Sequence, residues 1–281
     1  MVVNYIFLVG ISMVCLYPVI YVLFASLSNN NQLMQHTGPL AAPAGFSLAA
    51  YSRVFKNPMI LIGYRNTLFI LVVGVALSLF MTALGAYFLS RKDVLFKKPV
   101  MMFIIFTMFF SGGMIPTYLN LRDLHLINTL WGLIIPAAIS TYNMIIMRTG
   151  FMSIPDSLTE AAVIDGAGHF RILFSVILPL SKAIMAVMVL YYGIAIWNSW
   201  FWASAIIRER ELYPLQVILR EILLQNSALE MSIGVDAGDQ DSIALTIRYA
   251  TIIVSTVPVL CIYPFLQKYF SKGAMIGAVK E

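Results

Sequence analysis

The sequence contains very little charge. Only 11% of its 281 residues are Asp, Glu, Lys or Arg, whereas a typical soluble domain has about 25%. The first charged residue along the chain is Arg53, and hydrophobic residues make up 60% of the total. This composition argues against a soluble globular domain and predicts an integral membrane protein. The net charge is +5, and the basic residues are scattered through loops. They therefore do not indicate a nucleic-acid partner.

Histidine and cysteine are also scarce, which limits the chemistry available. The three histidines (His36, His125 and His169) are far apart, so no metal-ligand spacing is present. The chain has no G-x-x-x-x-G-K-[ST] phosphate loop. Cys15 and Cys261 lie in apolar runs and are expected to be small buried residues. We therefore expect no catalytic residue, no metal and no cofactor on this chain.

Long apolar runs are what the sequence has instead. Crossing a bilayer as a helix takes roughly 20 apolar residues, and the runs do not alternate as the strands of a membrane barrel would. The first run is too long for a signal peptide and no basic residue precedes it, which predicts a retained span at a short or trimmed amino terminus. We predict one all-α domain over residues 1–281 with spans at about 5–27, 66–89, 99–118, 129–148, 183–204 and 247–267.

The orientation follows from the short segment 91–98, which contains Arg91, Lys92, Lys97 and Lys98. Short loops rich in Lys and Arg face the cytoplasm. Alternation of the spans then places both termini and the segment 150–182 in the cytoplasm as well. No charged residue lies deep in a predicted span. Proton-driven carriers usually need one, so any uphill transport is expected to draw its energy from a partner.

Helix-breaking residues occur within several predicted spans. Pro18, Pro136 and Pro258, together with Gly112 and Gly113, are expected to interrupt otherwise regular helices. Such interruptions free backbone groups that can bind a ligand or allow bending. They are also common in membrane helices, so each is weak evidence by itself.

The stretch 157–179 is a polar, glycine-containing segment in this apolar chain. Ser157 is placed to cap a helix, and Glu160 three residues later completes a capping box. Gly166 and Gly168 then predict a turn, after which a second helix leads into the fifth span. The predicted product is a short helix held at the cytoplasmic membrane surface.

The residues of this segment resemble the EAA loop of the permease subunits of ABC importers. That pattern is E-A-A, three residues, G, nine residues and I-x-L-P, and this chain differs only in having Val176 for the isoleucine. The resemblance extends over the whole chain. The chain is similar to carbohydrate permeases of the maltose type, in the branch for complex or uronate-containing oligosaccharides. The further matching stretches are 109–118, 145–148, 197–201 and 263–270.

The resemblance implies a bacterial inner-membrane complex. The chain would pair with a second homologous permease, a dimeric ATPase that binds ATP and Mg, and an external solute-binding protein, in contact with membrane lipid. The loop 150–182 would then be the coupling helix, with Glu160 acting either through its charge or only as a helix cap. The implied coupling residues are Glu160, Ala161, Ala162, Asp165, Gly166, Ala167 and Pro179.

Two further sets of residues have open interpretations. Lys272, Gly273 and Gly277 in the tail either contact the ATPase or form a basic end near anionic lipid. A second set of polar and aromatic residues is expected to face a substrate cavity. For the tryptophans the alternative is an interfacial aromatic belt. The residues of this set are Asn66, Asn143, Trp197, Asn198 and Trp200.

The expected function is import of oligosaccharides, including acidic ones such as alginate or pectin fragments. The alternatives are import of a polyol or a glycerol phosphate ester, or a channel or membrane scaffold. The segment 150–182 distinguishes an importer from a channel or scaffold, since a channel has no need of a docking helix with this spacing.

Overall fold

The protein is described here by a computed structural model. It describes the backbone of residues 2–232 and 244–278, and the side chains of residues 3–224, 245–262 and 264. Over these residues the chain is helical, with no strand apart from an isolated bridge between Ser28 and Phe46. The all-α prediction is therefore confirmed. The helices form two compact units, Met1–Arg65 with Tyr213–Cys261 and Asn66–Leu212 with Ile262–Glu281.

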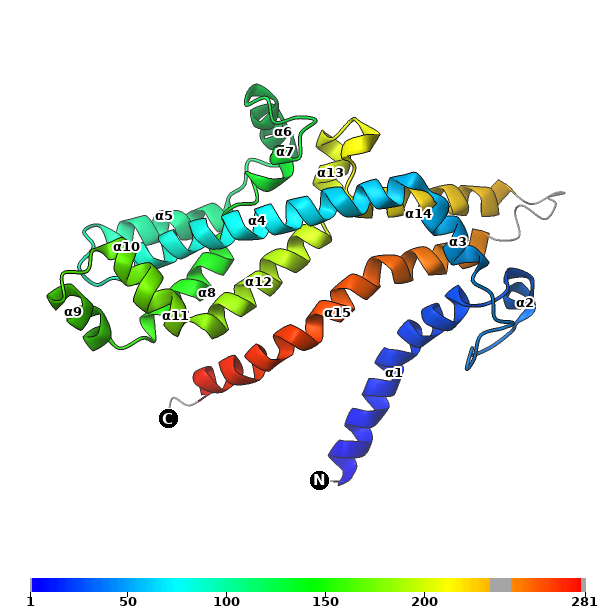
Figure 1. Cartoon of the computed structure of the whole chain (residues 1–281), viewed down its shortest axis with the longest axis horizontal. Helices are drawn as coiled ribbons and strands as arrows, with labels where there is room; N and C mark the ends of the chain where they lie inside the picture. Colours follow the sequence, from blue (N-terminus) through cyan, green and yellow to red (C-terminus); the bar gives the residue numbers. More distant parts are fainter. Residues whose placement is uncertain (1, 233–243, 279–281) are drawn as a thin grey trace. The chain divides into compact units, whose positions relative to one another are not determined.

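The first unit has a small core, and hydrogen bonds join segments of it that are far apart in the sequence. The Thr246 backbone N–H donates to Oδ1 of Asn30 at 3.2 Å, and the Tyr64 hydroxyl donates to the Val254 carbonyl at 2.7 Å. Both bonds join segments almost 200 residues or more apart. The helices of this unit are α1 (Val2–Ser26), α2 (Asn30–Gln35), α3 (Ala49–Lys56), the first turns of α4 (Pro58–Ser90), α14 (Leu215–Ser232) and the first part of α15 (Ala244–Ala278) (Figure 1).

The second unit contains the main core. It also contains two candidate functional sites, the segment 156–172 and a cavity. Its core is formed by large side chains with no exposed surface, such as Met147 and Phe151 on α8 and Met188 on α12. Figure 1 shows α4, α5, α8 and α12 running alongside one another. The elements are the rest of α4, α5 (Lys97–Phe109), α6 (Met114–Asp123), α7 (Trp131–Ile134), α8 (Thr141–Met152), α9 (Asp156–Ile164), α10 (His169–Ile172), a π-helical turn η1 (Leu173–Ile177), α11 (Leu178–Leu180), α12 (Lys182–Trp197), α13 (Trp200–Ile206), the 3₁₀ turn η2 (Arg210–Leu212) and the end of α15.

Three described helices are long and apolar enough to cross a membrane. They are Val3–Ser26, Pro58–Ser90 and Leu245–Ile262. The number rises to five if each of two bent helix pairs, 97–123 and 169–197, is one span. The predicted spans 5–27, 66–89 and 247–267 coincide with α1, α4 and α15, whereas the other three are not straight helices.

The interruptions occur at only some of the predicted positions. Gly112 and Gly113 separate α5 from α6, which are bent by 111°, and Gly113 has a φ of 85° that favours glycine. Pro136 lies in the non-helical stretch 135–140 between α7 and α8. Pro18 and Pro258 lie inside the continuous helices α1 and α15, so the predicted interruptions there are wrong. A proline in a membrane helix can be accommodated when the freed carbonyl finds a partner.

The prediction that the two cysteines are buried is also wrong. Cys15 on α1 and Cys261 on α15 are both exposed. They lie on the exposed surfaces of apolar helices that are long enough to cross a membrane. Hydropathy alone does not distinguish a buried position from an exposed one in such a helix.

Close helix packing leads to a first prediction, at Gly132 in α7. A Cβ atom at this position would lie 2.3 Å from the Leu126 carbonyl oxygen and 3.0 Å from Cδ1 of Ile206. Because a backbone atom cannot yield easily, we expect Gly132→Ala to lower the free energy of unfolding by about 1–3 kcal/mol. Thermal unfolding of the purified protein in detergent measures this. Gly10→Ala in α1 is the control, since no atom lies within 4 Å of its added Cβ, and equal melting temperatures for the two variants would contradict the packing argument.

Candidate functional site

A helical hairpin formed by α9 and α10 occupies the segment that the sequence singled out. The turn is closed by two hydrogen bonds, from the Gly166 N–H to the Val163 carbonyl and from the Ala167 N–H to the Ala162 carbonyl, both at 2.9 Å. Gly166 has a φ of 76°. This is the Schellman arrangement, in which a left-handed residue ends a helix and satisfies its last carbonyls. The glycine turn is therefore confirmed at Gly166.

The capping box that the sequence predicted is wrong. Helix α9 begins at Asp156, one residue before Ser157, with Pro155 at the N-cap position and no side-chain cap hydrogen bond. Proline fixes a φ suited to the start of a helix, and Asp156 places a negative charge in the first turn. Glu160 is exposed and has no hydrogen bond to another described residue. Its side chain therefore has no capping role in this conformation.

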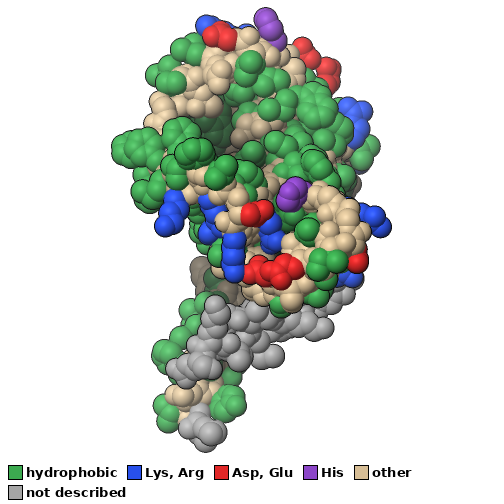
Figure 2. All heavy atoms as spheres, turned by 90° about the vertical axis from the view of Figure 1, so that its left-hand side faces the viewer, with side chains coloured by type: hydrophobic (Ala, Val, Ile, Leu, Met, Phe, Trp, Pro, Cys, Tyr) green, Lys and Arg blue, Asp and Glu red, His purple; other side chains and the backbone are tan. Residues whose placement is uncertain are grey.

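The outer surface of the hairpin combines acidic and large apolar side chains. Val163, Ile164 and Phe170 are exposed, with Ile164 at 86% and Phe170 at 69% of full exposure, and Asp165 is exposed between them. Large apolar side chains gathered in this way mark an interaction surface. Figure 2 looks onto this end of the unit, where acidic and basic side chains lie among hydrophobic ones.

The inner surface of the hairpin packs on the unit. Ala162 and Ala167 are partly buried against the core that contains Phe151 and Tyr87, and their small side chains permit a close approach. Of the other residues named for coupling, Ala161 and Pro179 are exposed.

The basic segment 91–98 contacts the hairpin directly. Nζ of Lys92 donates to Oδ2 of Asp156 at 2.5 Å, and Nη1 of Arg91 donates to Oγ1 of Thr159 at 3.1 Å. The hydrogen bond with Asp156 raises the pKa of Lys92, and the same bond lowers the pKa of Asp156. Both groups thus stay charged around neutral pH. Since the pair is exposed, its contribution to stability is small, and it joins the start of α9 to the basic segment.

The second helix of the hairpin continues into α12 through a distorted segment. A π-helical turn covers Leu173–Ile177, and Pro179 follows it. A proline cannot donate to the carbonyl four residues earlier and its ring collides with it, and a π turn widens the helix at such a point. The chain then bends by 87° at Ser181, which separates the hairpin from the straight helix α12.

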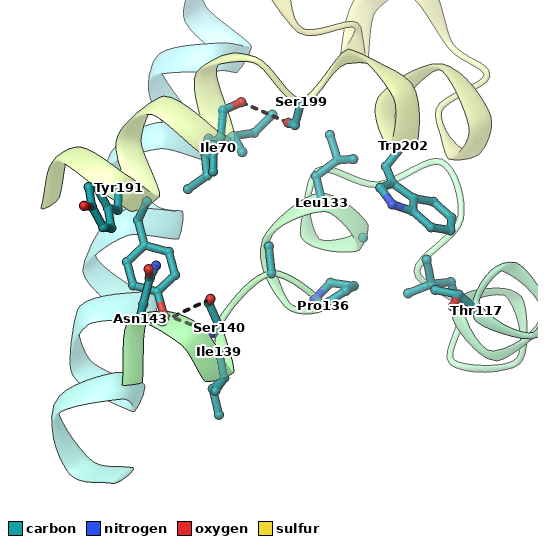
Figure 3. Close-up of a pocket in the computed structure, with 16 residues that line it drawn as sticks. Ile70, Thr117, Leu133, Pro136, Ile139, Ser140, Asn143, Tyr191, Ser199 and Trp202 are labelled. Carbon is teal, nitrogen blue, oxygen red and sulfur yellow. Dashed lines mark hydrogen bonds between the residues drawn. The ribbon is translucent and has the colours of Figure 1, made fainter. Parts of the chain in front are cut away.

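A cavity of about 530 Å³ lies in the same unit, within the range of about 300–1,000 Å³ usual for small-molecule sites. Figure 3 shows Tyr191, Asn143 and Ser140 on one side, Trp202 and Thr117 on the other, and Leu133 and Pro136 between them. No charged side chain is among the residues that line it. The remaining lining residues are Ile70, Leu121, Gly132, Ala137, Ile139, Tyr192, Ala195, Ile196 and Ser199.

The polar groups of the cavity are held by the non-helical stretch before α8. The Ser140 backbone N–H donates to the Tyr192 hydroxyl at 3.1 Å, and that hydroxyl lies 2.6 Å from Oγ1 of Thr82 in a buried hydrogen bond. Asn143 is only 6% exposed, and its side-chain amide has no hydrogen bond to a described residue. Because Asn143 lines the cavity, its amide can bond to a polar ligand or to ordered water there.

The structure brings only one of the five predicted cavity residues to this site. Asn143 lines it, whereas Asn66 is buried and donates to the Glu211 carbonyl at 2.7 Å. Trp197 is buried in the protein, Asn198 ends α12, and Trp200 packs edge-on against Phe201. A buried position for Trp197 does not fit an interfacial belt.

The sequence reasoning missed the hydroxyl groups of the cavity. Ser140, Tyr191 and Tyr192 line it but were not predicted. The tyrosine pair inside an apolar run was the available signal, because a phenol in a membrane helix usually has a polar partner.

Two other predictions concern the tail and metals. The backbone of Lys272, Gly273 and Gly277 continues α15, but their side chains lie outside the described residues. Among the described residues, no group of three or more His, Cys, Asp and Glu side chains is placed to hold a metal.

Apolar helices of membrane-crossing length define an α-helical membrane protein. No family model matches the chain. It is 38% identical to the polygalacturonan/rhamnogalacturonan transport system permease protein YtcP of Bacillus subtilis, over 98% of this chain and 96% of that one. It is also 38% identical to protein LplC of Bacillus subtilis, over 99% and 93%. A solved bacterial ABC transporter involved in import of the acidic polysaccharide alginate contains a similar chain, with 35% identity, a TM-score of 0.85 and coverage of 96% and 95%.

Identity of this extent over nearly the whole length leads to one conclusion. The chain belongs to the permease subunits of ABC carbohydrate importers. The resemblance seen in the EAA-type residues is thus confirmed, and the protein is a transport component.

The left-handed turn gives a second prediction, with two neighbouring glycines as a matched pair. An added Cβ at Gly166 or Gly168 would have no atom within 4 Å, but Gly166 has a φ of 76° and Gly168 one of −72°. Because left-handed backbone costs a non-glycine residue about 1–2 kcal/mol, Gly166→Ala should weaken the turn and Gly168→Ala should not. The rates of hydrogen exchange of the backbone amides of residues 166 and 167 measure the stability of the turn. Equal protection of these amides in both variants would contradict the prediction.

Proposed function

We propose that this chain is a permease subunit of an ATP-driven ABC importer that moves oligosaccharides delivered by an external binding protein. It would act with a second homologous permease and a dimeric ATPase in the bacterial inner membrane, with ATP and Mg bound by the ATPase. The observation that carries the proposal is the exposed α9–α10 hairpin with its EAA-type residues, in a chain 38% identical over 98% of its length to a polysaccharide-system permease.

The hairpin has the properties that a docking element for the ATPase requires. Its outward side presents Val163, Ile164 and Phe170 with acidic Glu160 and Asp165 nearby, and its inward side is fixed by small alanines and by the 91–98 segment. Apolar anchors with a charged rim are typical of protein interfaces. We infer that the ATPase receives this surface in a cleft and that Glu160 contributes through its charge, since no capping bond competes for it.

The proposed membrane topology has six crossings with both termini in the cytoplasm. Three long helices and two bent pairs supply five crossings, and α7 with α8 (131–152) would supply the sixth. The short loop 91–98 and the hairpin contact each other, which supports placing both on the same side of the membrane. The basic residues of that loop favour the cytoplasm. The proposal treats residues 1–281 as one permease domain.

The cavity is the proposed contact of this chain with sugar. Asn143, Ser140 and Tyr191 offer hydrogen-bonding groups to hydroxyls, and Trp202 offers an aromatic face. Two of the relatives are named for acidic polysaccharides, polygalacturonan/rhamnogalacturonan and alginate, so we propose an acidic oligosaccharide as the substrate. Because the cavity walls are neutral, this chain would recognise hydroxyls and ring faces, leaving carboxylates to the other subunits. The alternative solutes remain a polyol or a glycerol phosphate ester.

A third prediction separates charge from capping at Glu160. Glu160→Gln keeps the size of the side chain, and we expect the thermal stability to stay unchanged because no cap is lost. Stimulation of ATP hydrolysis by the loaded binding protein should fall at least about tenfold, since loss of one member of a buried charge pair costs about 2–5 kcal/mol. The measurement is the release of inorganic phosphate from ATP by the complete transporter in nanodiscs.

The control for this variant is Asp123→Asn, which removes an exposed acid on α6. It should leave the stimulation intact. Full stimulation in the Glu160→Gln transporter would refute the charge role, and strong sugar uptake by this chain without an ATPase or second permease would refute the proposed function itself.

A fourth prediction concerns the sugar cavity. Asn143→Leu retains much of the volume but removes the amide, and we expect the KM for sugar uptake to rise about two- to tenfold, the equivalent of about 0.5–1.5 kcal/mol for one hydrogen bond. Uptake into proteoliposomes of labelled trigalacturonate, an alginate trimer, maltotriose and glycerol phosphate measures both the effect and the preferred class.

Asn198→Leu is the matched control, because Asn198 is exposed at the end of α12 and does not line the cavity. An unchanged KM for Asn143→Leu, or an equal rise for Asn198→Leu, would remove the cavity from the proposal. Preference for maltotriose or glycerol phosphate would reject the acidic-oligosaccharide assignment.

A further inference from the structure

Helix α4 is apolar, yet two hydroxyl-bearing residues one turn apart bond to the cavity. Oγ of Ser78 donates to the Ala137 carbonyl at 3.3 Å, and Oγ1 of Thr82 lies 2.6 Å from the Tyr192 hydroxyl. Ala137 and Tyr192 both line the cavity. Thr82 has no exposed surface, so water cannot replace its bond, and breaking it would leave a buried polar group unpaired.

The cytoplasmic end of the same helix is joined to both helices of the hairpin. The Tyr87 hydroxyl lies 3.4 Å from Nδ1 of His169 on α10. The guanidinium of Arg91 lies 5.0 Å from the centre of the Tyr87 ring, and its Nη1 donates to Thr159 on α9. Cation–π and hydrogen-bond contacts from one guanidinium thus connect the end of α4 with α9.

The two sets of contacts are separated by a short, tightly packed piece of helix. Ser78 and Tyr87 are nine residues apart, which is about 13 Å along an α-helix. Between them Ala83 and Ala86 are buried in the main core, against residues of α8 and α12. A densely packed helix of this kind moves as a unit rather than deforming, so its two ends shift together.

The alternative connection from hairpin to cavity runs along the chain and is much less direct. It passes through the π-helical turn, Pro179 and the 87° bend before it reaches Tyr192 on α12. Prolines and π turns interrupt the regular i to i−4 hydrogen bonding of a helix and cause sharp kinks, so this connection is not one continuous regular helix. Helix α4, by contrast, is one helix from Pro58 to Ser90.

We infer that α4 carries the movement of the coupling hairpin to the sugar cavity, with Tyr87 and Arg91 positioning the hairpin and Thr82 positioning Tyr192 in the cavity wall. The inference rests on the proposed function and adds a defined route to it. Coupling requires an element with two states that both sites bias, and the inference assigns this role to α4 because it is bonded to both sites.

The test uses the complete transporter in nanodiscs and proteoliposomes, with the binding protein and labelled trigalacturonate as the probe. Tyr87→Phe removes only the hydroxyl next to His169, and Thr82→Val removes only the bond to Tyr192. We expect basal ATP hydrolysis to be retained and the sugar moved per ATP to fall about two- to tenfold in each variant, as loss of one hydrogen bond predicts. Because the two residues lie on one route, the double variant should lose less than the product of the two single effects.

Matched controls separate a transmitting role from a structural one. Thr107→Val removes a hydroxyl that bonds only within α5, and Tyr142→Phe removes an exposed hydroxyl; both should keep the wild-type ratio. Arg91→Lys should retain more of the ratio than Arg91→Ala, since a cation stays near Tyr87.

The outcomes distinguish the inference from the function on which it rests. A wild-type complex whose ATP hydrolysis ignores the loaded binding protein, or that moves no trigalacturonate, overturns the proposed function and the inference with it. A coupled wild type with an unchanged ratio in Tyr87→Phe and Thr82→Val overturns the inference alone. Fully multiplicative effects in the double variant also overturn it, because they indicate two independent contributions.

Discussion

One hydroxyl group, that of Tyr192, joins α12 to α4 and to the non-helical stretch beside the cavity. It accepts a hydrogen bond from the Ser140 N–H, at the point where the non-helical stretch 135–140 gives way to α8, and it pairs with Thr82 on α4. In a bilayer no water is available to satisfy backbone groups, so a broken helix persists only where protein groups or a water-filled cavity replace the lost bonds. The break is thus supported by side chains from two other helices, and the cavity exists because the break does.

The backbone groups at the turn of the hairpin are also satisfied within the chain. Its turn satisfies the last carbonyls of α9 with two backbone bonds around Gly166, while Pro155 and Asp156 make a side-chain cap unnecessary at the start. Its apolar and acidic outer side chains are available for contact with another protein, and its alanines and the Arg91 and Lys92 contacts set its direction.

The sequence predicted the hairpin better than the cavity, for physical reasons. Spacing of Gly166 from Glu160 is a local signal, and a left-handed turn follows from the glycine itself. The capping box failed because the N-cap position is Pro155, two residues before Ser157. Asn66 and Trp197 were assigned to a cavity by residue type alone, but their tertiary neighbours use them otherwise. Hydropathy located α1, α4 and α15 and could not locate the breaks near Gly113 and Pro136, since an apolar run reads the same whether or not it bends.

The neutral lining of the cavity has a consequence for the conditions under which such a permease works. Attraction between charges weakens as ionic strength rises, because salt screens it over about 10 Å at 0.1 M. Hydrogen bonds and ring stacking inside a cavity without ionised groups are largely insensitive to salt. Under the proposed function, a change in the salinity around the bacterium would alter the capture of an acidic sugar outside the cell, while the step within this chain would proceed with the same preference.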